Sequence, residues 1–448
     1  MTRDILVQAA AVLICISESP AFALTLGEAV ERAIHNDPTY LSAQADLDVS
    51  RERYEEALAS LRPQISASAN TSYNRRDYVQ FSAIADDPFL ENFNSNSVQL
   101  NLTQPLWHHA DRIAVTQADL AVSQAGFQLM AANQDLLMRL AQSWFDIMHA
   151  RDALLENDAK VQRMKQQWEQ ARRSHEVGVF SADELEDANS ANAEAMARRA
   201  EAQSMLAIKQ AELEQIIGVA EMAPPILSEK YSLPDSGDLA EPWLALAENR
   251  NPTLLAAQRN LESARQEVRK QRAAHEPTLD LVASHGRNAQ GYGLSGGQSG
   301  FSSWLDTVGM QFNMPLYAGG ANAARVRIAI ALQNKAEQDW ETALRGVRKG
   351  VKQIWFFLQA KRAQLASAQQ AVYSTIFALR GAESARSRGI KADADVLLAQ
   401  QKNISAECNW RKVRYEAVLY YLKLKAIAGT LSATDLSELD KEFYLAPR

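Results

Sequence analysis

The chain has 448 residues, and its 47 Lys and Arg against 54 Asp and Glu give a formal net charge of −7. Because the basic excess that binds phosphates is missing, a nucleic-acid partner is not expected. Mean hydropathy is −0.29 and no apolar run approaches the ~20 residues of a membrane-spanning helix, which excludes a helical membrane protein but not a β-barrel, whose alternating strands barely raise hydropathy.

The amino terminus has the pattern of a secretory signal peptide. An apolar stretch at 5–17 is followed by the small residues of an A-x-A cleavage site, Ala21-Phe22-Ala23. We predict a signal peptide at 1–23 and a mature chain from Leu24; the alternative is a buried first helix. The cysteine in this stretch does not follow a small residue, so lipidation is not expected. Cys408 is the second of two cysteines, so packing without an intrachain disulfide would hold the exported chain together.

A duplicated unit runs along the chain. Residues 37–63 align without a gap on 251–277 at an offset of 214, and paired prolines stand at 38/252, 63/277 and 105/315. Such a repeat indicates two copies of one structural unit. The predicted organisation is a signal peptide at 1–23, a first repeat at 24–218, a linker at 219–240, a second repeat at 241–429 and a C-terminal tail at 430–448.

Each repeat contains a long stretch without a helix breaker. No proline occurs between Pro105 and Pro224, or between Pro315 and Pro447. In both stretches apolar residues recur every seven positions, which is the spacing of a coiled-coil seam. The two stripes are Leu140, Ile147, Leu154, Val161, Trp168 and Val351, Leu358, Leu365, Val372, Leu379.

These stretches predict helical hairpins. A helix over about 110–177 would be ~100 Å long. Gly178 and Gly389 would allow the chain to reverse, since glycine tolerates the left-handed backbone that ends many helices. Returning helices are predicted over 184–217 and 394–428, and the alanine content of the first suits close helix approach.

Segments ahead of the long helices alternate apolar and polar residues, which is typical of strands with one apolar and one polar face. Strand lengths near ten residues suit tilted membrane strands of ~9–11 residues. Trp107 and Tyr317 follow the strands, where an aromatic girdle would meet the lipid headgroups. The alternating segments lie at 64–73, 98–103, 279–283 and 308–312, with surface loops expected at about 74–96 and 286–303.

Four strands cannot close a barrel, and an open edge cannot face lipid because its backbone groups would be unsatisfied. The predicted fold is therefore a mixed α/β membrane protein. Each chain would add four strands to a shared transmembrane β-barrel, continued by a long coiled-coil α-helical barrel. Two copies would give a pore filled by side chains and three or more would leave a lumen; strand arithmetic does not choose the number.

Across the whole mature chain, the sequence resembles the TolC family of outer-membrane exit ducts. The resemblance rests on the duplicated unit, on 313–320 with Arg325-Val-Arg327, and on 389–397. It implies a homotrimer with a twelve-stranded barrel in the cell outer membrane and a helical tunnel through the periplasm. It also implies docking, through a periplasmic membrane-fusion (adaptor) protein, to an inner-membrane ABC exporter or RND pump. It implies neither an enzyme nor a cofactor.

The resemblance also suggests a gate at the periplasmic tip of the tunnel. Asp395 stands six residues after Gly389, where the family has a constriction acid, and Glu184 is its counterpart after Gly178. Copies of one carboxylate around an axis would favour cations. The candidate gate partners are Lys391, Arg386, Asp187, Asp183 and Asp393.

Two departures from the family pattern stand at this tip. The second family acid is replaced by Leu398, and an aromatic residue before the glycine is replaced by Arg386. The alternative interpretation of the acids is a solvated turn in which they cap the returning helices. Both interpretations remain open at the level of sequence.

Two further motifs carry no function. Residues 294–298 read LSGGQ, as in ABC ATPases, but the chain contains no Gly-Lys pair and therefore no phosphate-binding loop. His108 and His109 are adjacent and lack an evident third ligand, so no metal site is predicted.

The leading hypothesis is an outer-membrane exit duct for type I protein secretion or for efflux of drugs and other small molecules. The alternative is a periplasmic coiled-coil scaffold without a pore.

Overall fold

The computed structural model describes residues 24–80, 87–218, 226–228, 231–235, 237, 239–291 and 300–444. The predicted signal peptide at 1–23 and the LSGGQ motif lie outside these residues. Within them the chain forms two compact units, one comprising 24–41, 134–240 and 352–444 and the other 42–133 and 241–351. None of the helices in this described portion is both long enough and apolar enough to span a bilayer.

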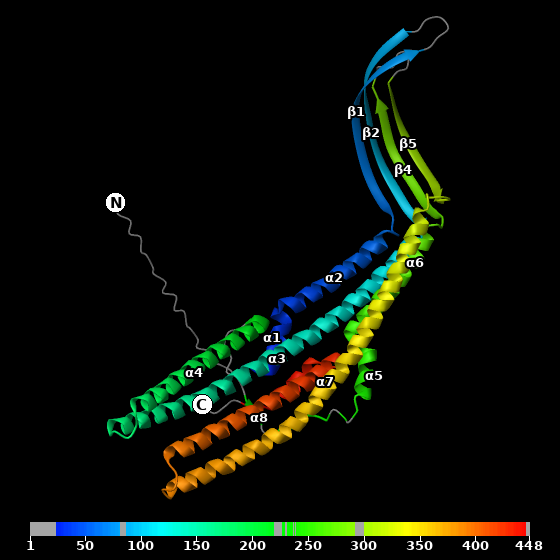
Figure 1. The fold of residues 1–448 in the computed structure, drawn as a ribbon. Helices are drawn as coiled ribbons and strands as arrows, with labels where there is room; N and C mark the ends of the chain where they lie inside the picture. Colours follow the sequence, from blue (N-terminus) through cyan, green and yellow to red (C-terminus); the bar gives the residue numbers. More distant parts are fainter. Residues whose placement is uncertain are drawn as a thin grey trace, which may run out of the picture. The chain divides into compact units, whose positions relative to one another are not determined.

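The order of elements repeats once along the chain (Figure 1). The first copy consists of α1 (Leu26–Asn36), α2 (Pro38–Ala59), β1 (Gln64–Gln80), β2 (Asp87–Trp107), α3 (His109–Glu176) and α4 (Ala182–Ile217). The second consists of α5 (Glu241–Arg250), α6 (Pro252–Ala273), β4 (Thr278–Gln290), β5 (Phe301–Asn313), α7 (Ala321–Ser387) and α8 (Asp393–Ile427). The duplicated strand-and-helix architecture expected from the sequence is confirmed.

The four long strands form one antiparallel sheet in the order β1-β2-β4-β5. Its register aligns Ala67, Leu100, His285 and Asp306 across the strands and therefore places every second residue on one face. On that face twelve neighbouring positions are apolar, whereas the opposite face carries mostly Ser, Thr, Asn and Gln. The apolar positions are Ile65, Ala67, Ala69, Val98, Leu100, Leu102, Leu279, Leu281, Ala283, Val308, Met310 and Phe312.

The strands extend beyond the alternating segments, so the expected loops at 74–96 and 286–303 are too long. Backbone pairing continues through Asn74↔Phe93 to Gln80↔Asp87, and through Gln290↔Phe301 in the second hairpin. The physical reason is that a ladder of backbone hydrogen bonds needs no apolar face. Where both faces of a sheet meet water, alternation disappears from the sequence although the strands continue.

The long helices have the predicted bounds to within two residues. α3 contains 68 residues and α7 contains 67, with α4 and α8 returning beside them (Figure 1). The seven-residue stripes are fully buried at Leu140, Ile147 and Leu358 and partly exposed from Leu154 and Leu365 onward. Packing within one chain therefore covers only one end of each stripe.

The main hydrophobic core lies in the first unit, where α1, α3, α4 and α8 meet. Trp144 and Phe145 are its largest side chains, and both contact the ring of Phe443 at centroid distances of 6.2 and 6.1 Å. Phe443 belongs to β6 (Phe443–Tyr444), which pairs with β3 (Ile226–Leu227). The region expected to be a tail thus contains ordered structure, including α9 (Ala433–Asp440).

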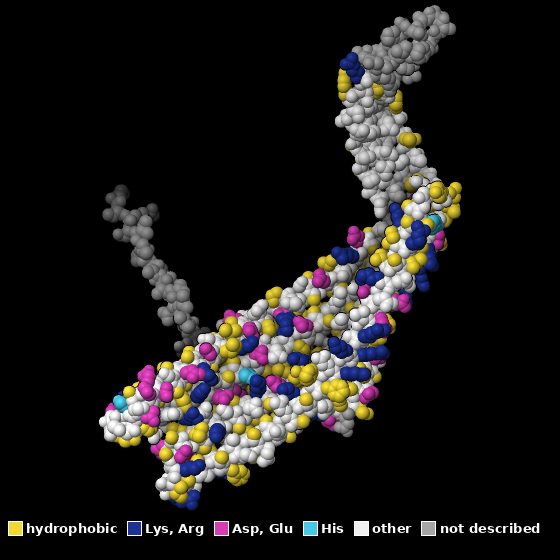
Figure 2. All heavy atoms as spheres, in the orientation of Figure 1, with side chains coloured by type: hydrophobic (Ala, Val, Ile, Leu, Met, Phe, Trp, Pro, Cys, Tyr) yellow, Lys and Arg dark blue, Asp and Glu magenta, His cyan; other side chains and the backbone are white. Residues whose placement is uncertain are grey.

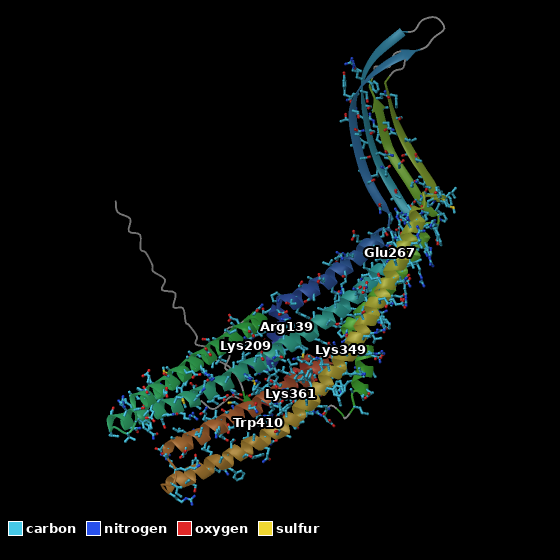
Figure 3. The ribbon with its side chains drawn as sticks, in the orientation of Figure 1. Arg139, Lys209, Glu267, Lys349, Lys361 and Trp410 are labelled. Atoms are coloured by element: carbon cyan, nitrogen blue, oxygen red, sulfur yellow. The ribbon has the colours of Figure 1, made fainter. Side chains whose placement is uncertain are left out.

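A buried ion pair fixes the corner between α1 and α2. The Asp37 carboxylate, only 3% exposed, accepts two hydrogen bonds from Arg139 on α3, at 2.8 and 3.0 Å, and one from the backbone N–H of Tyr40 (Arg139 is labelled in Figure 3). The hydrogen bonds from Arg139 outweigh burial and lower the pKa of Asp37. In the second repeat Asn251 takes this position and caps α6 through Leu254. Gly350 stands where the first repeat has Arg139, so the cap is repeated but the ion pair is not.

Asp37→Asn should lower the free energy of unfolding by about 2 kcal/mol, because the cap is retained while Arg139 loses its buried partner. The matched control is Asp135→Asn, which removes an exposed carboxylate that also bonds Arg139, at 2.7 Å, and should cost under ~1 kcal/mol. Denaturant titration followed by circular dichroism in detergent measures both. Equal losses in the two variants would contradict the role assigned to the buried pair.

Candidate gate at the helical hairpin tips

The first hairpin reverses through a left-handed glycine. Gly178 has φ +77°, and the backbone N–H of Val179 donates to the Ser174 carbonyl at 2.8 Å. The Nδ1 atom of His175 lies 2.9 Å from the carbonyl oxygen of Phe180. These bonds fix the turn that precedes α4 and thereby the position of the acids that begin it.

Glu184 caps α4 in a reciprocal arrangement. Its carboxylate accepts the backbone N–H of Ser181 at 2.8 Å, and the Ser181 hydroxyl accepts the N–H of Glu184 at 3.2 Å. In this capping box the Glu184 carboxylate is already engaged as a hydrogen-bond acceptor at the helix N-terminus. Glu184 is nevertheless exposed, as are Asp183 and Asp187, so all three charges reach solvent in the single chain.

The second hairpin repeats the turn with half of the cap. Gly389 has φ +72°, and the Asp395 carboxylate accepts the backbone N–H of Ala392 at 3.2 Å. Ala392 has no side-chain acceptor to reciprocate. Asp395 is exposed, like Glu184, and the two acids take equivalent places at the starts of α8 and α4.

The candidate gate partners do not form one cluster. Arg386 forms an ion pair with Asp393 inside the second tip, while Lys391 is exposed on the same turn. The residue equivalent to Arg386 in the first repeat is His175, which bonds the backbone instead. The two tips therefore use different side chains at the same position.

The tips also differ in the residue that precedes the glycine, a difference that the sequence prediction did not include. Val177 and Val179 are 74% and 71% exposed on the first turn. The equivalent second-turn positions are Arg388 and Ile390. Aligning the two turns on their glycines would have revealed that Arg388 replaces Val177, whereas an exposed apolar residue follows the glycine in both turns.

The two girdle candidates lie where the sheet meets the long helices. Trp107 ends β2, is 47% exposed, and has the guanidinium of Arg112 5.1 Å from its ring centroid. Tyr317 follows β5 and is 87% exposed. In Figure 2 the visible face of the described sheet carries few charged side chains, whereas the helices carry many of both signs.

His108 and His109 contact carboxylates at the start of α3. His108 lies between Asp111, at 2.8 Å, and Asp280 of β4, at 3.0 Å, while His109 lies 2.7 Å from Glu276. Burial lowers the pKa of His108, but the hydrogen bonds to the two carboxylates together raise it by more than burial lowers it. The net shift of the pKa is therefore upward. Among the described residues, no set of three or more His, Cys, Asp or Glu side chains has the arrangement of a metal site.

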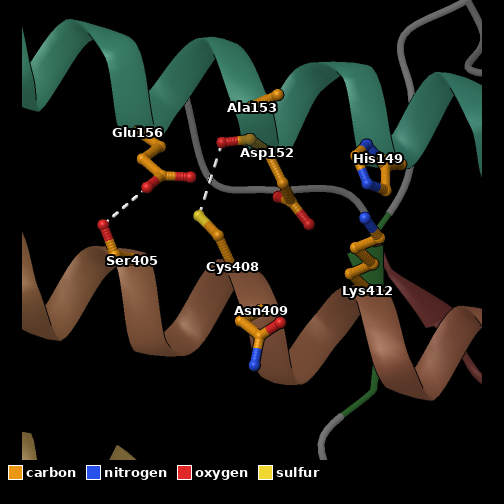
Figure 4. Close-up of a pocket in the computed structure, with 8 residues that line it drawn as sticks. All are labelled: His149, Asp152, Ala153, Glu156, Ser405, Cys408, Asn409 and Lys412. Atoms are coloured by element: carbon orange, nitrogen blue, oxygen red, sulfur yellow. Dashed lines mark hydrogen bonds between the residues drawn. The ribbon is translucent and has the colours of Figure 1, made fainter.

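The single cysteine of the described chain is a packed side chain. A cavity of about 300 Å³ lies between α3 and α8 (Figure 4). In it the Cys408 thiol donates to the Asp152 carbonyl at 3.4 Å, and the Asp152 carboxylate accepts from Arg411 at 2.9 Å. Burial raises the pKa of Cys408 to about 12, which keeps the thiol protonated at neutral pH. A protonated thiol is a poor nucleophile.

Comparison with known proteins identifies the architecture. The family model described as "Outer membrane efflux protein" matches residues 29–219 and 243–430, which correspond to the two repeats. The chain belongs to this family. It is therefore an outer-membrane exit duct for efflux and secretion, reaching from the outer membrane into the periplasm, and this favours the duct over the coiled-coil scaffold.

Relatives along the full length agree with this assignment. The proteases secretion protein PrtF of Dickeya chrysanthemi is 26% identical over 97% of this chain and 95% of its own length. The outer membrane protein TolC of Vibrio cholerae is 27% identical over 96% of both. The Campylobacter jejuni CmeC channel has the same fold with a TM-score of 0.75 at 17% identity, covering 94% of this chain and 90% of its own.

The contacts of His108 predict a pH-dependent contribution to stability. A histidine whose folded pKa lies above its unfolded value stabilises fully below the unfolded value of ~6.5, and the contribution is lost as pH rises through the folded pKa. Wild type should therefore exceed His108→Gln in melting temperature by about 1–3 °C at pH 6, with a smaller difference at pH 8.5. His35→Gln, an exposed helix-end histidine, is the control. A difference that grows with pH would contradict the assignment.

Proposed function

We propose that three copies of this chain form one exit duct that opens through its periplasmic hairpin tips. The observation that carries this proposal is the four-stranded sheet with one apolar face and two unpaired edges, β1 and β5. Lipid offers no hydrogen bonds to such edges, so each edge needs a strand from another chain. Three sheets would give twelve strands, which is wide enough to leave a lumen.

Exposed apolar side chains on the long helices support the same assembly. Phe356 and Phe377 on α7 are 64% and 71% exposed in the single chain. Large apolar side chains on a long periplasmic helix favour burial against further helices. A helical tunnel made from the two repeats, 24–218 and 241–429, of three chains would supply them.

The gate of this duct would be formed by Asp395 and Glu184. Both carboxylates are exposed beside the hairpin turns, and three copies of each would surround the axis with negative charge. Ion pairs such as Arg386 with Asp393 would hold the second tips, and Lys391, Asp183 and Asp187 are free to take part in contacts between hairpins. Capping and gating are compatible roles, because a cap uses only part of a carboxylate.

The duct would work with a periplasmic adaptor and an inner-membrane ABC exporter or RND pump. The PrtF relative is named for protease secretion, which supports type I protein secretion as one cargo class. CmeC, of the same fold, is described only as an outer membrane channel. Drug or small-molecule efflux is the second cargo class. Trp107 and Tyr317 would anchor the barrel at the periplasmic side of the membrane.

Planar-bilayer conductance of the detergent-purified protein tests the gate. Wild type should give small, cation-preferring currents, and Asp395→Asn combined with Glu184→Gln should give larger or less cation-selective ones. The amide side chains keep an acceptor for the capping hydrogen bonds and remove only the charge. The variant therefore separates gating from capping.

Glu194→Gln, an exposed carboxylate further along α4, is the matched control and should leave the currents unchanged. Identical currents from wild type and the double variant would leave the duct intact but remove these acids from its gate. Absence of any pore activity from well-folded protein would contradict the duct itself.

A further inference from the structure

The apolar face of the sheet ends abruptly on two of its strands. At the level where β1 and β2 still present Ala67 and Leu100, the same row continues into His285 of β4 and Asp306 of β5. The next row of that face pairs Arg287 with Trp304. Four polar or aromatic side chains therefore follow directly on the apolar positions, on one half of the sheet.

These four side chains contact one another. The rings of His285 and Trp304 stack with centroids 5.2 Å apart, and the guanidinium of Arg287 lies 6.0 Å from the Trp304 centroid. His285 pairs with Asp306. The Nε–H of Arg287 donates to the Ser302 hydroxyl at 3.0 Å. Within the described residues no carboxylate pairs with Arg287, so its charge is not neutralised locally.

The position of this cluster determines what surrounds it. Arg287 is eight residues beyond Leu279 along β4, which corresponds to about 20 Å along the membrane normal at ~3.3 Å per residue and a tilt near 40°. The apolar band of an outer-membrane barrel is ~25 Å tall. Arginine facing lipid is strongly destabilising at the centre of that band and nearly neutral at its rim. A stable Arg287 therefore lies at the outer headgroup level.

We infer that the Arg287–Trp304–His285 cluster binds the phosphate group of an outer-leaflet lipid. Guanidinium binds phosphate oxygens with two parallel hydrogen bonds, and Arg287 retains N–H groups for this after bonding Ser302. Trp304 provides the amphipathic ring that favours the interface. The apolar rows below offer Leu281, Ala283 and Val308 to the acyl chains of the same molecule.

This inference rests on the proposed barrel, because it requires the apolar face to meet lipid. It adds that one position on the outer surface of the barrel binds a specific charged lipid, in addition to the general contact between the apolar face and the acyl chains of the bilayer. Since each chain carries one such cluster, an assembly of copies would hold one lipid at each. Such a lipid would fix the height of the barrel in the membrane from its outer side, opposite Trp107 and Tyr317.

Native mass spectrometry of the detergent-purified full-length protein tests the site. The probes are phosphatidic acid, diacylglycerol with the same acyl chains, and inorganic phosphate. Phosphatidic acid should bind wild type, and Arg287→Gln should weaken that binding about tenfold, as expected for loss of a charge-assisted hydrogen-bond pair. Arg287→Lys should recover part of the affinity, because it keeps the charge and loses the two-pronged geometry. Arg345→Gln on α7 removes an exposed arginine outside the sheet and should bind like wild type.

Equal binding of diacylglycerol, or unchanged binding by Arg287→Gln, would overturn the site. Displacement by millimolar inorganic phosphate would show a free-anion site and would overturn the assignment to a lipid. Trp304→Leu keeps apolar bulk at the neighbouring position and should weaken binding less than Arg287→Gln. Conductance of each variant separates the two proposals. Loss of lipid binding with normal currents would contradict the lipid site and leave the duct intact. Absence of currents in wild type would contradict the duct alone.

Discussion

Unpaired backbone groups in lipid are the constraint on which this molecule depends. A water-exposed sheet edge can hydrogen-bond solvent, whereas an edge in the hydrocarbon region leaves each N–H and C=O without a partner, at several kcal/mol per group. The sheet of this chain has two such edges and an apolar face that suits lipid. The chain is therefore built as part of a larger assembly. Its partly exposed helix stripes agree with that, because a protein that functions as a single chain would be expected to bury its apolar stripes within that chain.

Duplication gives the two halves the same elements but not the same interactions. Asp37 and Asn251 cap equivalent helices, yet only Asp37 has a buried arginine partner. Glu184 and Asp395 begin equivalent helices, yet only Glu184 has a reciprocating hydroxyl. The hairpin turn needs only a left-handed glycine and a cap, which leaves the remaining tip side chains free to diverge.

The sheet shows a related division of roles along its length. Its lower rows are uniformly apolar on one face, and its outer rows carry charged, aromatic and polar side chains on that same face. Charge on such a face is tolerated only where it is neutralised or reaches headgroups. His285 pairs with Asp306, whereas within the described residues no carboxylate pairs with Arg287. That difference is the basis for assigning a ligand to Arg287.

The sequence by itself determined the periodic features of this protein. Proline-free stretches with a seven-residue stripe specified α3 and α7, period-two alternation specified the four strands, and paired prolines specified the duplication. It could not determine the length of the strands, because alternation ends where both faces meet water while backbone pairing continues. It also missed α9 and the β3–β6 pair, which are too short to show a period. The tertiary structure alone decided which polar residues meet, such as Asp37 with Arg139 and Arg287 with Trp304, because contacts between distant segments depend on register and packing rather than on local pattern.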